Sequence, residues 1–447
     1  MAKIPGFFSL KHFLVLSLAL NVSLVMRVVF ENEKQGPVFG FCLSKLRGSL
    51  MADDQASQRT LQATPSSWAK TQNSLAEVKD DLERVVNLDH GDPTMYEHYW
   101  ENMGERTTIV IRGWQSMSYF SDIKNICWFL EPELAKQVVR LHKVVRNAET
   151  EGRHIVVGTG SSQLFLAALF ALSPKEATEP ISVVSAAPYY SSYPTMTDYQ
   201  KSALHKWAGD SRIFNQMGPY IELVTSPNNP DGFIRHSCVN RSGGAIIHDL
   251  AYYWPQYTPM TFPADNDLSL FTVSKSTGHA GMRIGWALVK DPEVAKKMTK
   301  FIELNTIGVS KDSQLRAAKV LEVVADSCVQ SGGSEFRESF FEFSYRLMAE
   351  RWQQLRETVN NSNGIFSLPE FSPAFCQFHG RDLEPQPAFA WLRCRDDIED
   401  CESYLRGFKI LTRGGKHFGA STKYVRVSML DRDENFRVFL KRLSAIR

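Results

Sequence analysis

Lys275 is the residue of this chain whose surroundings best suit covalent chemistry. It follows an apolar run of strand length and composition, Leu268 to Val273, and small hydroxylated residues flank it. Burial at the mouth of a strand lowers the pKa of a lysine and frees its amine, which can then form a Schiff base with a carbonyl cofactor. Arg283 follows a glycine-rich turn and could bind a phosphate group. Lys275 alone would more often be a surface lysine, so this prediction depends on matching elements upstream.

The Gly158–Ser162 loop is a second element that could take part in binding or catalysis. It joins an apolar strand, Ile155 to Val157, to an apolar helix, Gln163 to Leu172. Its glycines let the backbone approach an anion, and the free N–H groups at the start of a helix bind phosphate. Ser161 and Ser162 would add hydroxyl donors, although serines at this position also commonly cap helices.

Further polar residues follow three other predicted strands, Ile181 to Ala186, Tyr220 to Thr225 and Ala245 to His248. Asn229 lies in an Asn-Pro-Asp-Gly turn, where its amide could donate to a phenolate oxygen or simply form the turn. Asp249 ends a buried strand, where an unpaired carboxylate is costly. A protonated ring nitrogen would be its natural partner, and a helix cap is the alternative. Tyr252 could donate a phenolic hydrogen bond, and Tyr189 could stack on a flat ring or belong to the core.

Together these residues meet the demands of pyridoxal 5'-phosphate. The cofactor needs a glycine–serine loop and an arginine for its phosphate, a carboxylate for its ring nitrogen, Asn and Tyr for its phenolate oxygen, and a lysine for its aldehyde. Their order along the chain resembles that of the fold-type-I aminotransferases. Two positions depart from the lysine signature of that family: Thr272 stands where glycine or serine is usual, and His279 where a hydrophobic residue is usual.

Longer segments narrow the resemblance to the alliinase branch of these enzymes and, within it, to the plant tryptophan aminotransferase-related group. The segments are Asn87–Thr94, Met117–Asp122, Thr225–Gly232, His248–Pro255 and Ser276–Gly281. The resemblance covers residues 87–447. It implies a homodimer with shared active sites, in which Tyr119 reaches the cofactor phosphate. It also implies that Ser274 contacts the cofactor and that Arg426 binds the substrate carboxylate.

The resemblance implies an enzyme that transfers the amino group of L-tryptophan to a keto acid such as pyruvate. The product would be indole-3-pyruvate, on the indole-pyruvate route to auxin. A carbon–sulfur lyase acting on cysteine sulfoxides is the close alternative, because it would use the same cofactor and the same base. Family lyases carry a cysteine-rich module ahead of the catalytic body, whereas residues 31–86 contain only Cys42. A binding protein that lost catalysis is a third alternative, against which the intact Lys275 argues.

Alternating apolar runs and helical patterns define the expected fold. From Pro132 to Val289 they predict a mostly parallel sheet with helices on both faces and ligands at the carboxyl ends of the strands. We expect an α/β fold with a large cofactor domain, residues 87–330, and a smaller α+β domain, residues 331–447. The start of the large domain would form an arm of the small one. A net charge of +2 gives no indication of nucleic-acid binding.

The first 86 residues differ from the rest. Basic residues precede an apolar run from Phe13 to Met26, which predicts a signal anchor in residues 1–30; a cleaved signal and a transit peptide remain alternatives. Residues 31–86 are polar and predict a flexible linker. The seven cysteines lack metal-ligand spacing, and we interpret them as reduced thiols, although Cys394 and Cys401 are close enough to pair. We therefore expect an anchor in the endoplasmic reticulum membrane, a catalytic body in the cytosol and no metal site.

Overall fold

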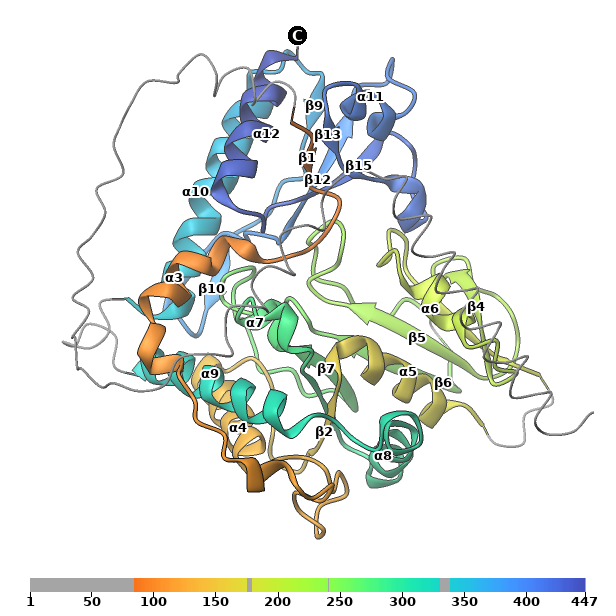
Figure 1. The fold of residues 1–447 in the computed structure, drawn as a ribbon. Coiled ribbons are helices and arrows are strands. Elements are labelled where there is room, and N and C mark those ends of the chain that lie inside the picture. The colour runs from red at the N-terminus through yellow and green to blue at the C-terminus, as the bar shows by residue number, and fades with distance from the viewer. Residues whose placement is uncertain (1–83, 175–178, 240, 330–337, 447) are drawn as a thin grey trace, which may run out of the picture. The chain divides into compact units, whose positions relative to one another are not determined.

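A seven-stranded sheet and a four-stranded sheet position most of the residues predicted to bind cofactor and substrate (Figure 1). The structure is a computed structural model that describes residues 84–174, 179–239, 241–329 and 338–446. The strands of the larger sheet, in spatial order, are β2 (His154–Gly158), β8 (Gly285–Val289), β7 (Leu268–Thr272), β6 (Gly244–Asp249), β5 (Tyr220–Thr225), β3 (Ile181–Ser185) and β4 (His205–Asp210). Strand β8 runs antiparallel to both of its neighbours, and the other pairs are parallel. This arrangement confirms the expected α/β class with a mostly parallel sheet.

Helices connect these strands and pack over the sheet. The helices of this part are α3 (Glu97–Asn102), α4 (Pro132–Val145), α5 (Gly160–Leu172), α6 (Tyr193–Tyr199), α7 (Val273–Ser276), α8 (Pro292–Thr306) and α9 (Lys311–Val329). Helix α5 contacts strands β2, β6, β7 and β8 and packs against α8, while α4 packs against α9. Proline at the first turn starts both α4 and α8, and the Asp291 side chain caps α8 by accepting from the Glu293 N–H at 2.7 Å.

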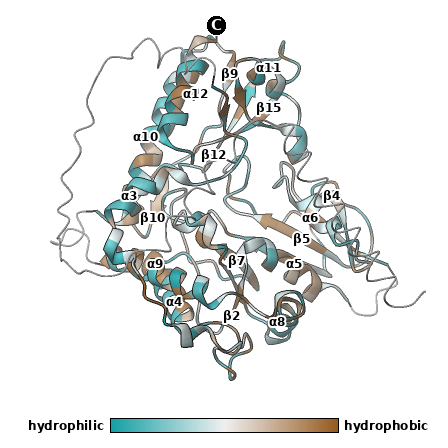
Figure 2. Cartoon of the chain, in the orientation of Figure 1, coloured by the Kyte–Doolittle hydropathy of each residue, from teal (hydrophilic) through white to brown (hydrophobic). Residues whose placement is uncertain are grey.

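The hydropathy of the central strands and of α5 explains why these elements form the interior of the fold. Strand β5 is buried at every position, and Figure 2 shows that β5 and α5 are predominantly hydrophobic. Helices α10 (Phe340–Asn360) and α12 (Asp433–Ala445) instead show both hydrophilic and hydrophobic residues, as expected for helices with one face on a core. Strand β4 was not predicted. Its residues include Lys206, Gly209 and Asp210, which do not form the apolar run by which the other strands were predicted. It pairs with β3 in a register that is irregular between Val183 and Val184.

The smaller sheet has the strand order β14-β15-β12-β9. The remaining elements are β9 (Phe366–Ser367), β10 (Ala374–Cys376), β11 (Arg381–Leu383), β12 (Phe389–Cys394), α11 (Cys401–Gly407), β13 (Ile410–Leu411), β14 (Arg413–Gly414) and β15 (Tyr424–Ser428). Short 3-10 helices are η1 (Thr94–Tyr96), η2 (Gly104–Thr107), η3 (Gly113–Ser116), η4 (Ala280–Met282) and η5 (Gly415–Phe418). The domain boundary near residue 330 stays a prediction.

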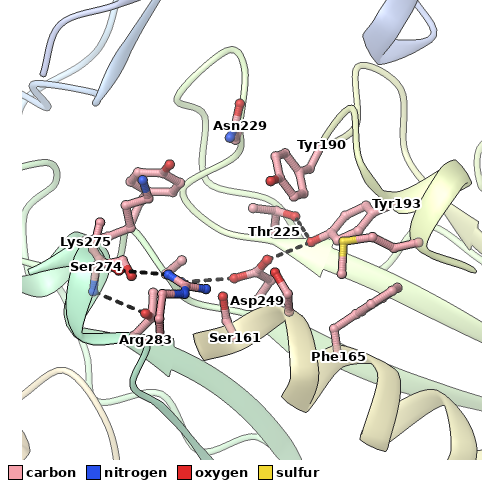
Figure 3. Close-up of a pocket in the computed structure, with 16 residues that line it drawn as sticks. Ser161, Phe165, Tyr190, Tyr193, Thr225, Asn229, Asp249, Ser274, Lys275 and Arg283 are labelled. Atoms are coloured by element: carbon pink, nitrogen blue, oxygen red, sulfur yellow. Dashed lines mark hydrogen bonds between the residues drawn. The ribbon is translucent and has the colours of Figure 1, made fainter. Parts of the chain in front are cut away.

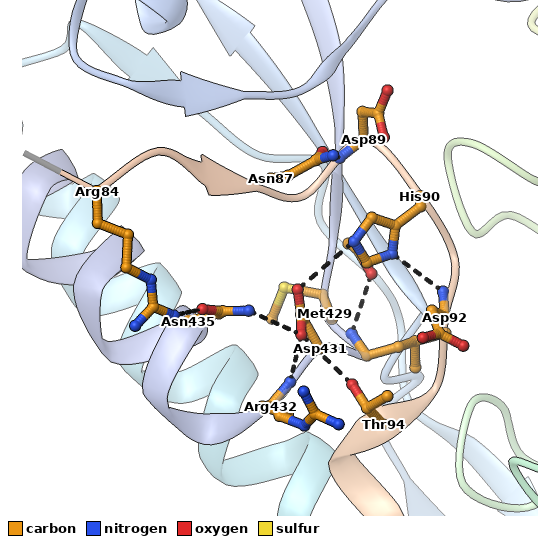
Figure 4. A network of polar contacts seen from close by, with 12 residues as sticks. Arg84, Asn87, Asp89, His90, Asp92, Thr94, Met429, Asp431, Arg432 and Asn435 are labelled. Carbon is orange, nitrogen blue, oxygen red and sulfur yellow. Dashed lines mark hydrogen bonds and ion pairs between the residues drawn. The ribbon is translucent and has the colours of Figure 1, made fainter. Parts of the chain in front are cut away.

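An N-terminal arm, residues 86–94, contacts this smaller sheet and forms a separate two-stranded sheet with β13. Its strand β1 (Val86–Asn87) pairs in parallel with β13, and the Leu88 carbonyl accepts from the Ser428 N–H at 3.0 Å. The Asp431 carboxylate accepts from the Thr94 hydroxyl at 3.3 Å and lies 3.7 Å from the His90 ring (Figure 4). The arm is therefore held at both ends by residues from the C-terminal part of the chain.

The prediction of a transmembrane segment is corrected. Within the described ranges, no helix is long and apolar enough to cross a membrane. Residues 1–30, on which that prediction was placed, and most of the predicted linker lie outside the described residues. The location of the protein in the cell stays a prediction.

The interpretation of all cysteines as reduced thiols is also wrong. Cys394 and Cys401 form a disulfide, with 5.6 Å between their Cα atoms. Cys394 ends β12 and Cys401 starts α11, so the short connection between the two elements brings both side chains together at a separation that suits the bond. Cys127, Cys238, Cys328 and Cys376 are free thiols.

A buried, uncharged histidine on α4 contacts the larger sheet. His142 Nδ1 lies 2.7 Å from Asn147 Oδ1, and its Nε2 accepts a hydrogen bond from the Trp286 indole at 2.9 Å. The Asn147 amide in turn donates to the Tyr253 carbonyl at 2.8 Å. Burial lowers the pKa of His142 to about 4, with the Asn147 hydrogen bond acting in the opposite direction. The folded protein therefore binds a proton at His142 less readily than the unfolded chain does.

This difference predicts a loss of stability in acid. The stabilisation is complete above the ordinary histidine pKa, near 6.5, and is lost as the pH falls towards about 4. Replacing His142 with Gln keeps a donor and an acceptor but removes the titration. Between pH 7.5 and pH 5 the free energy of unfolding of the wild type should fall further than that of His142→Gln, by on the order of 1 to 2 kcal/mol. Urea unfolding at both pH values measures this, and parallel losses would contradict it.

Candidate active site

The carboxyl ends of β5, β6 and β7 and the first turn of α5 surround a cavity of about 210 Å³ (Figure 3). Ligands commonly bind at this edge of open α/β sheets. The cavity brings together most of the predicted cofactor residues, namely Ser161, Ser162, Asn229, Asp249, Tyr252, Ser274, Lys275 and Arg283. Tyr119, Tyr189 and Arg426 are not among the residues that line it.

Lys275 lies in α7, immediately beyond the end of β7. The side chain of Thr272 caps this short helix by accepting from the Ser274 N–H at 3.2 Å. The Lys275 ammonium donates to the carbonyl of Gly91 in the N-terminal arm. Burial and the positive charges of Arg426 and Arg283 together lower the pKa of Lys275 to about 8, while the charges of Asp92 and Asp249 act in the opposite direction. A substantial fraction of the amine is therefore neutral, and nucleophilic, close to neutral pH.

The main chain of Lys275 is held by residues that the sequence did not indicate. Its carbonyl accepts from the Gln256 amide and the Tyr257 hydroxyl, each at 3.2 Å. Tyr96, at the end of η1, donates to the Tyr257 hydroxyl at 3.2 Å. Helix α7 has only four residues, so its carbonyls need partners outside the helix. These contacts fix the position from which the lysine side chain extends.

Asp249 faces the cavity from the end of β6. Burial raises its pKa, while hydrogen bonds from Tyr193 and from the Ala251 N–H and the charge of Lys275 act in the opposite direction. The Tyr193 hydroxyl lies 2.9 Å from the Asp249 carboxylate and 2.6 Å from the Thr225 hydroxyl. A carboxylate in this position is costly to keep charged, and a cationic ring nitrogen would offset that cost.

Tyr193 is a candidate functional residue that sequence reasoning missed. It is buried at the start of α6, a seven-residue helix that was not predicted. A tyrosine in such a segment resembles any core aromatic residue. Its role becomes visible only through its contact with Asp249, which lies far away in the sequence (Figure 3).

The other end of the cavity suits an anion. Ser161 and Ser162 lie in the first turn of α5, where free N–H groups and the helix dipole favour negative charge. Gly160 has a φ of +75°, and a Cβ at this position would lie 2.5 Å from Nη2 of Arg283. Arg283 itself has a left-handed backbone conformation, with φ 55°. The absent side chain at Gly160 therefore gives the guanidinium room beside the helix start.

Tyr189, which was predicted to stack on the cofactor ring, lies next to a tyrosine that faces the cavity. Tyr190, and not Tyr189, lines the cavity. The Tyr189 ring packs against Trp207, with 4.9 Å between centroids, and lies close to Gly419 of the C-terminal part. Periodicity in a turn does not specify which of two adjacent tyrosines points inward, so the sequence could not separate them.

Arg426 approaches the cavity from β15 of the smaller sheet. It is 3% exposed, and its Nη1 donates to Asn229 Oδ1 at 3.0 Å, while Nη2 donates to the Asp89 carbonyl. Its guanidinium lies 4.2 Å from the centre of the Phe389 ring. Burial lowers its pKa to about 10. Among the described residues it has no carboxylate partner, and its Nε has no hydrogen-bond partner, so the arginine suits an anionic ligand.

Tyr119 lies elsewhere, on an exposed segment. It is 67% exposed, and the neighbouring Trp114, Met117 and Phe120 are also large, apolar and exposed. Within the described residues of one chain it does not reach the cavity. Its predicted role therefore requires a second copy of the chain.

The donors around the cavity fit pyridoxal phosphate. The helix start, two serines and Arg283 suit its phosphate, Asp249 its ring nitrogen, and Lys275 its aldehyde. The space at Gly160 and the raised pKa of Asp249 are two independent features of the structure that this ligand would explain.

Solved structures place the fold among the fold-type-I aminotransferases. A substrate-bound BacF structure from Bacillus subtilis covers 87% of this chain and 98% of its own, with a TM-score of 0.60 and 18% identity. An aspartate aminotransferase from Thermus thermophilus with maleate covers 85% of this chain and 97% of its own, with a TM-score of 0.59 and 17% identity. At these identities the likeness concerns the fold.

Sequence comparison then defines the family. The profile of the family described as Allinase matches residues 86–447, and the chain belongs to this family. Tryptophan aminotransferase-related protein 2 of Arabidopsis thaliana is 54% identical over 446 residues, which is 100% of this chain and 99% of that protein. Its namesake from Oryza sativa subsp. japonica is 57% identical, over 86% of this chain and 77% of that protein. Alliin lyase of Allium cepa var. aggregatum is 36% identical, over 77% of this chain and 78% of that protein.

These findings confirm the predicted resemblance to the alliinase branch and its tryptophan aminotransferase-related group. The chain has the fold of pyridoxal-phosphate-dependent aminotransferases, and its family includes both proteins named as aminotransferase-related and lyases. The roles of individual site residues stay predictions.

Gly160 allows a test of the anion site. Gly160→Ala would place a methyl group against the Arg283 guanidinium and strain a backbone with positive φ, so binding of pyridoxal phosphate should weaken by about tenfold or more. Gly281→Ala is the matched control, because a Cβ there meets nothing within 4 Å. Absorbance or fluorescence titration of each variant measures the dissociation constant. Equal affinities would mean that the Gly160–Arg283 contact does not shape a phosphate site.

Proposed function

We propose that this protein is a pyridoxal-phosphate-dependent aminotransferase that converts L-tryptophan to indole-3-pyruvate. A keto acid such as pyruvate accepts the amino group, and the reaction serves the indole-pyruvate route of auxin biosynthesis. The observation that carries the proposal is the meeting, around one cavity, of a lysine with a lowered pKa, a cavity-facing aspartate and an arginine at a helix start. The names of the relatives at 54% and 57% identity support tryptophan as the substrate.

The proposed site divides into regions with separate tasks. Arg283, Ser161 and Ser162 bind the cofactor phosphate, Tyr190 covers one face of the ring, and Asn229 and Tyr252 hydrogen-bond its phenolate oxygen. When bound, pyridoxal phosphate supplies an aldehyde that joins the substrate amine and a ring that delocalises the charge left when Cα loses its proton. Arg426 binds the substrate carboxylate and thereby orients Cα towards Lys275.

Lys275 and Asp249 control protons in this proposal. The neutral Lys275 amine removes the proton from Cα and returns one later, as general base and then general acid. Its pKa near 8 suits both directions of transfer close to neutral pH. Asp249 keeps the ring nitrogen protonated, because an opposite charge in a poorly hydrated site favours the protonated form. Tyr193 orients the aspartate through its hydrogen bond.

A carbon–sulfur lyase acting on cysteine sulfoxides is the alternative function. Alliin lyases are 36% to 37% identical to the chain, and the same base and cofactor would serve an elimination. The higher identity to the aminotransferase-related proteins favours transamination.

We further propose a homodimer with shared sites. Its support is the exposed apolar segment around Tyr119, whose burial against a second copy would remove Trp114, Met117 and Phe120 from water. In such a dimer, Tyr119 would contribute to the phosphate site of the partner subunit.

Product analysis tests the proposed reaction. The purified protein, loaded with pyridoxal phosphate, receives pyruvate and either tryptophan, phenylalanine or an alkyl cysteine sulfoxide. We expect indole-3-pyruvate and alanine from tryptophan. Lys275→Ala should reduce turnover to below a few per cent, because it removes the only base in the proposal. Ammonia and a sulfenic acid released from the sulfoxide, without indole-3-pyruvate from tryptophan, would instead establish the lyase.

Asp249→Asn tests the placement of the cofactor ring. The variant keeps the shape of the side chain and should still bind cofactor through Arg283 and the start of α5. The single-turnover rate with tryptophan should fall by at least about 100-fold, since one preorganised electrostatic partner is lost. Tyr193→Phe, which removes one hydrogen bond to the carboxylate, should slow the same step by about tenfold. Rapid-mixing absorbance measures both rates, and an Asp249→Asn variant at the wild-type rate would show that this aspartate does not contact the ring.

A further inference from the structure

Two arginines lie directly opposite each other on neighbouring strands of the smaller sheet. Arg413 of β14 and Arg426 of β15 are register partners in an antiparallel pair, so their side chains leave the same face of the sheet. Like charges in this arrangement repel. The positive charge of Arg413 also lowers the pKa of Arg426, after the larger effect of burial. The pair therefore needs negative charge on its exposed side.

Asp89 of the N-terminal arm contacts both arginines. Its carbonyl accepts from Arg426, and its carboxylate lies 3.8 Å from Nη2 of Arg413. Arg413 Nη1 also donates to the Ser191 hydroxyl at 3.2 Å, and Ser191 follows Tyr190, which lines the cavity. Arg413 and Asp89 thus lie beside Arg426, next to the cavity.

The Asp89 carboxylate is positioned for this contact and not for the cluster that holds the arm. In Figure 4 its side chain points away from the contact between His90 and Asp431. Its N–H donates to Asn87 Oδ1 at 3.1 Å, and its carbonyl is fixed by Arg426. These two backbone contacts therefore hold the carboxylate near Arg413.

The ion pair itself is weak. The Arg413 and Asp89 side chains are 33% and 39% exposed, and 3.8 Å is too long for a hydrogen bond. A pair of this kind contributes little to the stability of the fold. Its charges nevertheless attract or repel any charged ligand that approaches Arg426.

We propose that Arg413 is a second carboxylate-binding position beside Arg426 and that Asp89 occupies it. The protein thereby selects keto acid acceptors with one carboxylate, such as pyruvate, over 2-oxo dicarboxylates. The proposal rests on the proposed function, in which Arg426 binds the carboxylate next to the reacting carbon. A second carboxylate on the acceptor would meet the charge of Asp89, whereas an uncharged indole ring carries no charge to be repelled.

Binding of two unreactive acids tests this selection directly. Glutarate and pentanoate have the same chain length, and a methyl group replaces one carboxylate in pentanoate. Calorimetry on the protein loaded with pyridoxal phosphate gives both dissociation constants. In the wild type, glutarate should bind no more tightly than pentanoate. In Asp89→Asn, glutarate should bind at least about tenfold more tightly than pentanoate, because Arg413 is then free for the second carboxylate.

Variants of Arg413 test whether this arginine is the second carboxylate-binding position. Arg413→Ala leaves the charge of Asp89 uncompensated, so glutarate should bind several-fold more weakly than pentanoate. The double variant Asp89→Asn/Arg413→Ala should lose the preference for glutarate. Asp265→Asn is the matched control, because Asp265 pairs with Arg153 away from the site, and it should leave both constants unchanged.

The same variants should change the choice of acceptor. In Asp89→Asn the ratio of kcat/KM for 2-oxoglutarate to that for pyruvate should rise by about tenfold. An unchanged preference between glutarate and pentanoate in both Asp89→Asn and Arg413→Ala would overturn the inference. Because these acids do not react, that result is separate from the proposed function, which fails only if the wild type forms no indole-3-pyruvate.

Discussion

The removal of water from around Lys275 is the interaction on which the rest of the site depends. It lowers the pKa of the amine to about 8, and the charges of Arg426 and Arg283 act in the same direction. The same poorly hydrated environment raises the pKa of Asp249, which is why the aspartate needs the Tyr193 hydroxyl and the Ala251 N–H. Base and carboxylate are thus tuned in opposite directions by one physical cause.

This dry environment is made by parts of the chain that are distant in sequence. The larger sheet supplies Lys275 and Asp249, whereas the arm supplies the Gly91 carbonyl and β15 supplies Arg426. A side chain at Gly91 would approach the Phe389 ring to 2.9 Å and the Lys275 ammonium to 3.3 Å. The arm therefore passes over the lysine with no space to spare, and only a glycine allows that close approach.

The sequence was sufficient to predict the strands that end at the cavity, because each is an apolar run followed by polar residues. It predicted β5 with its observed bounds and β7 to within one residue. Contacts made across the fold were not predictable in this way. The choice of Tyr190 over Tyr189, the contact of Tyr193 with Asp249 and the pairing of Arg413 with Asp89 depend on which strands lie side by side. The disulfide was missed for a different reason, since an assumed reducing compartment outweighed the short spacing of Cys394 and Cys401.

The pairing of β1 with β13 also constrains how the protein is made. Val86 pairs with Ile410, and the Leu88 carbonyl is bonded only by Ser428 among the described backbone groups. A ribosome synthesises the first strand long before its partner, so residues 86–94 wait without their hydrogen bonds while the larger sheet forms. Such distant pairing is slow to form, because a long loop must close first. Truncation near residue 400 would remove β13 and Ser428, which hold the arm whose Gly91 carbonyl accepts from Lys275.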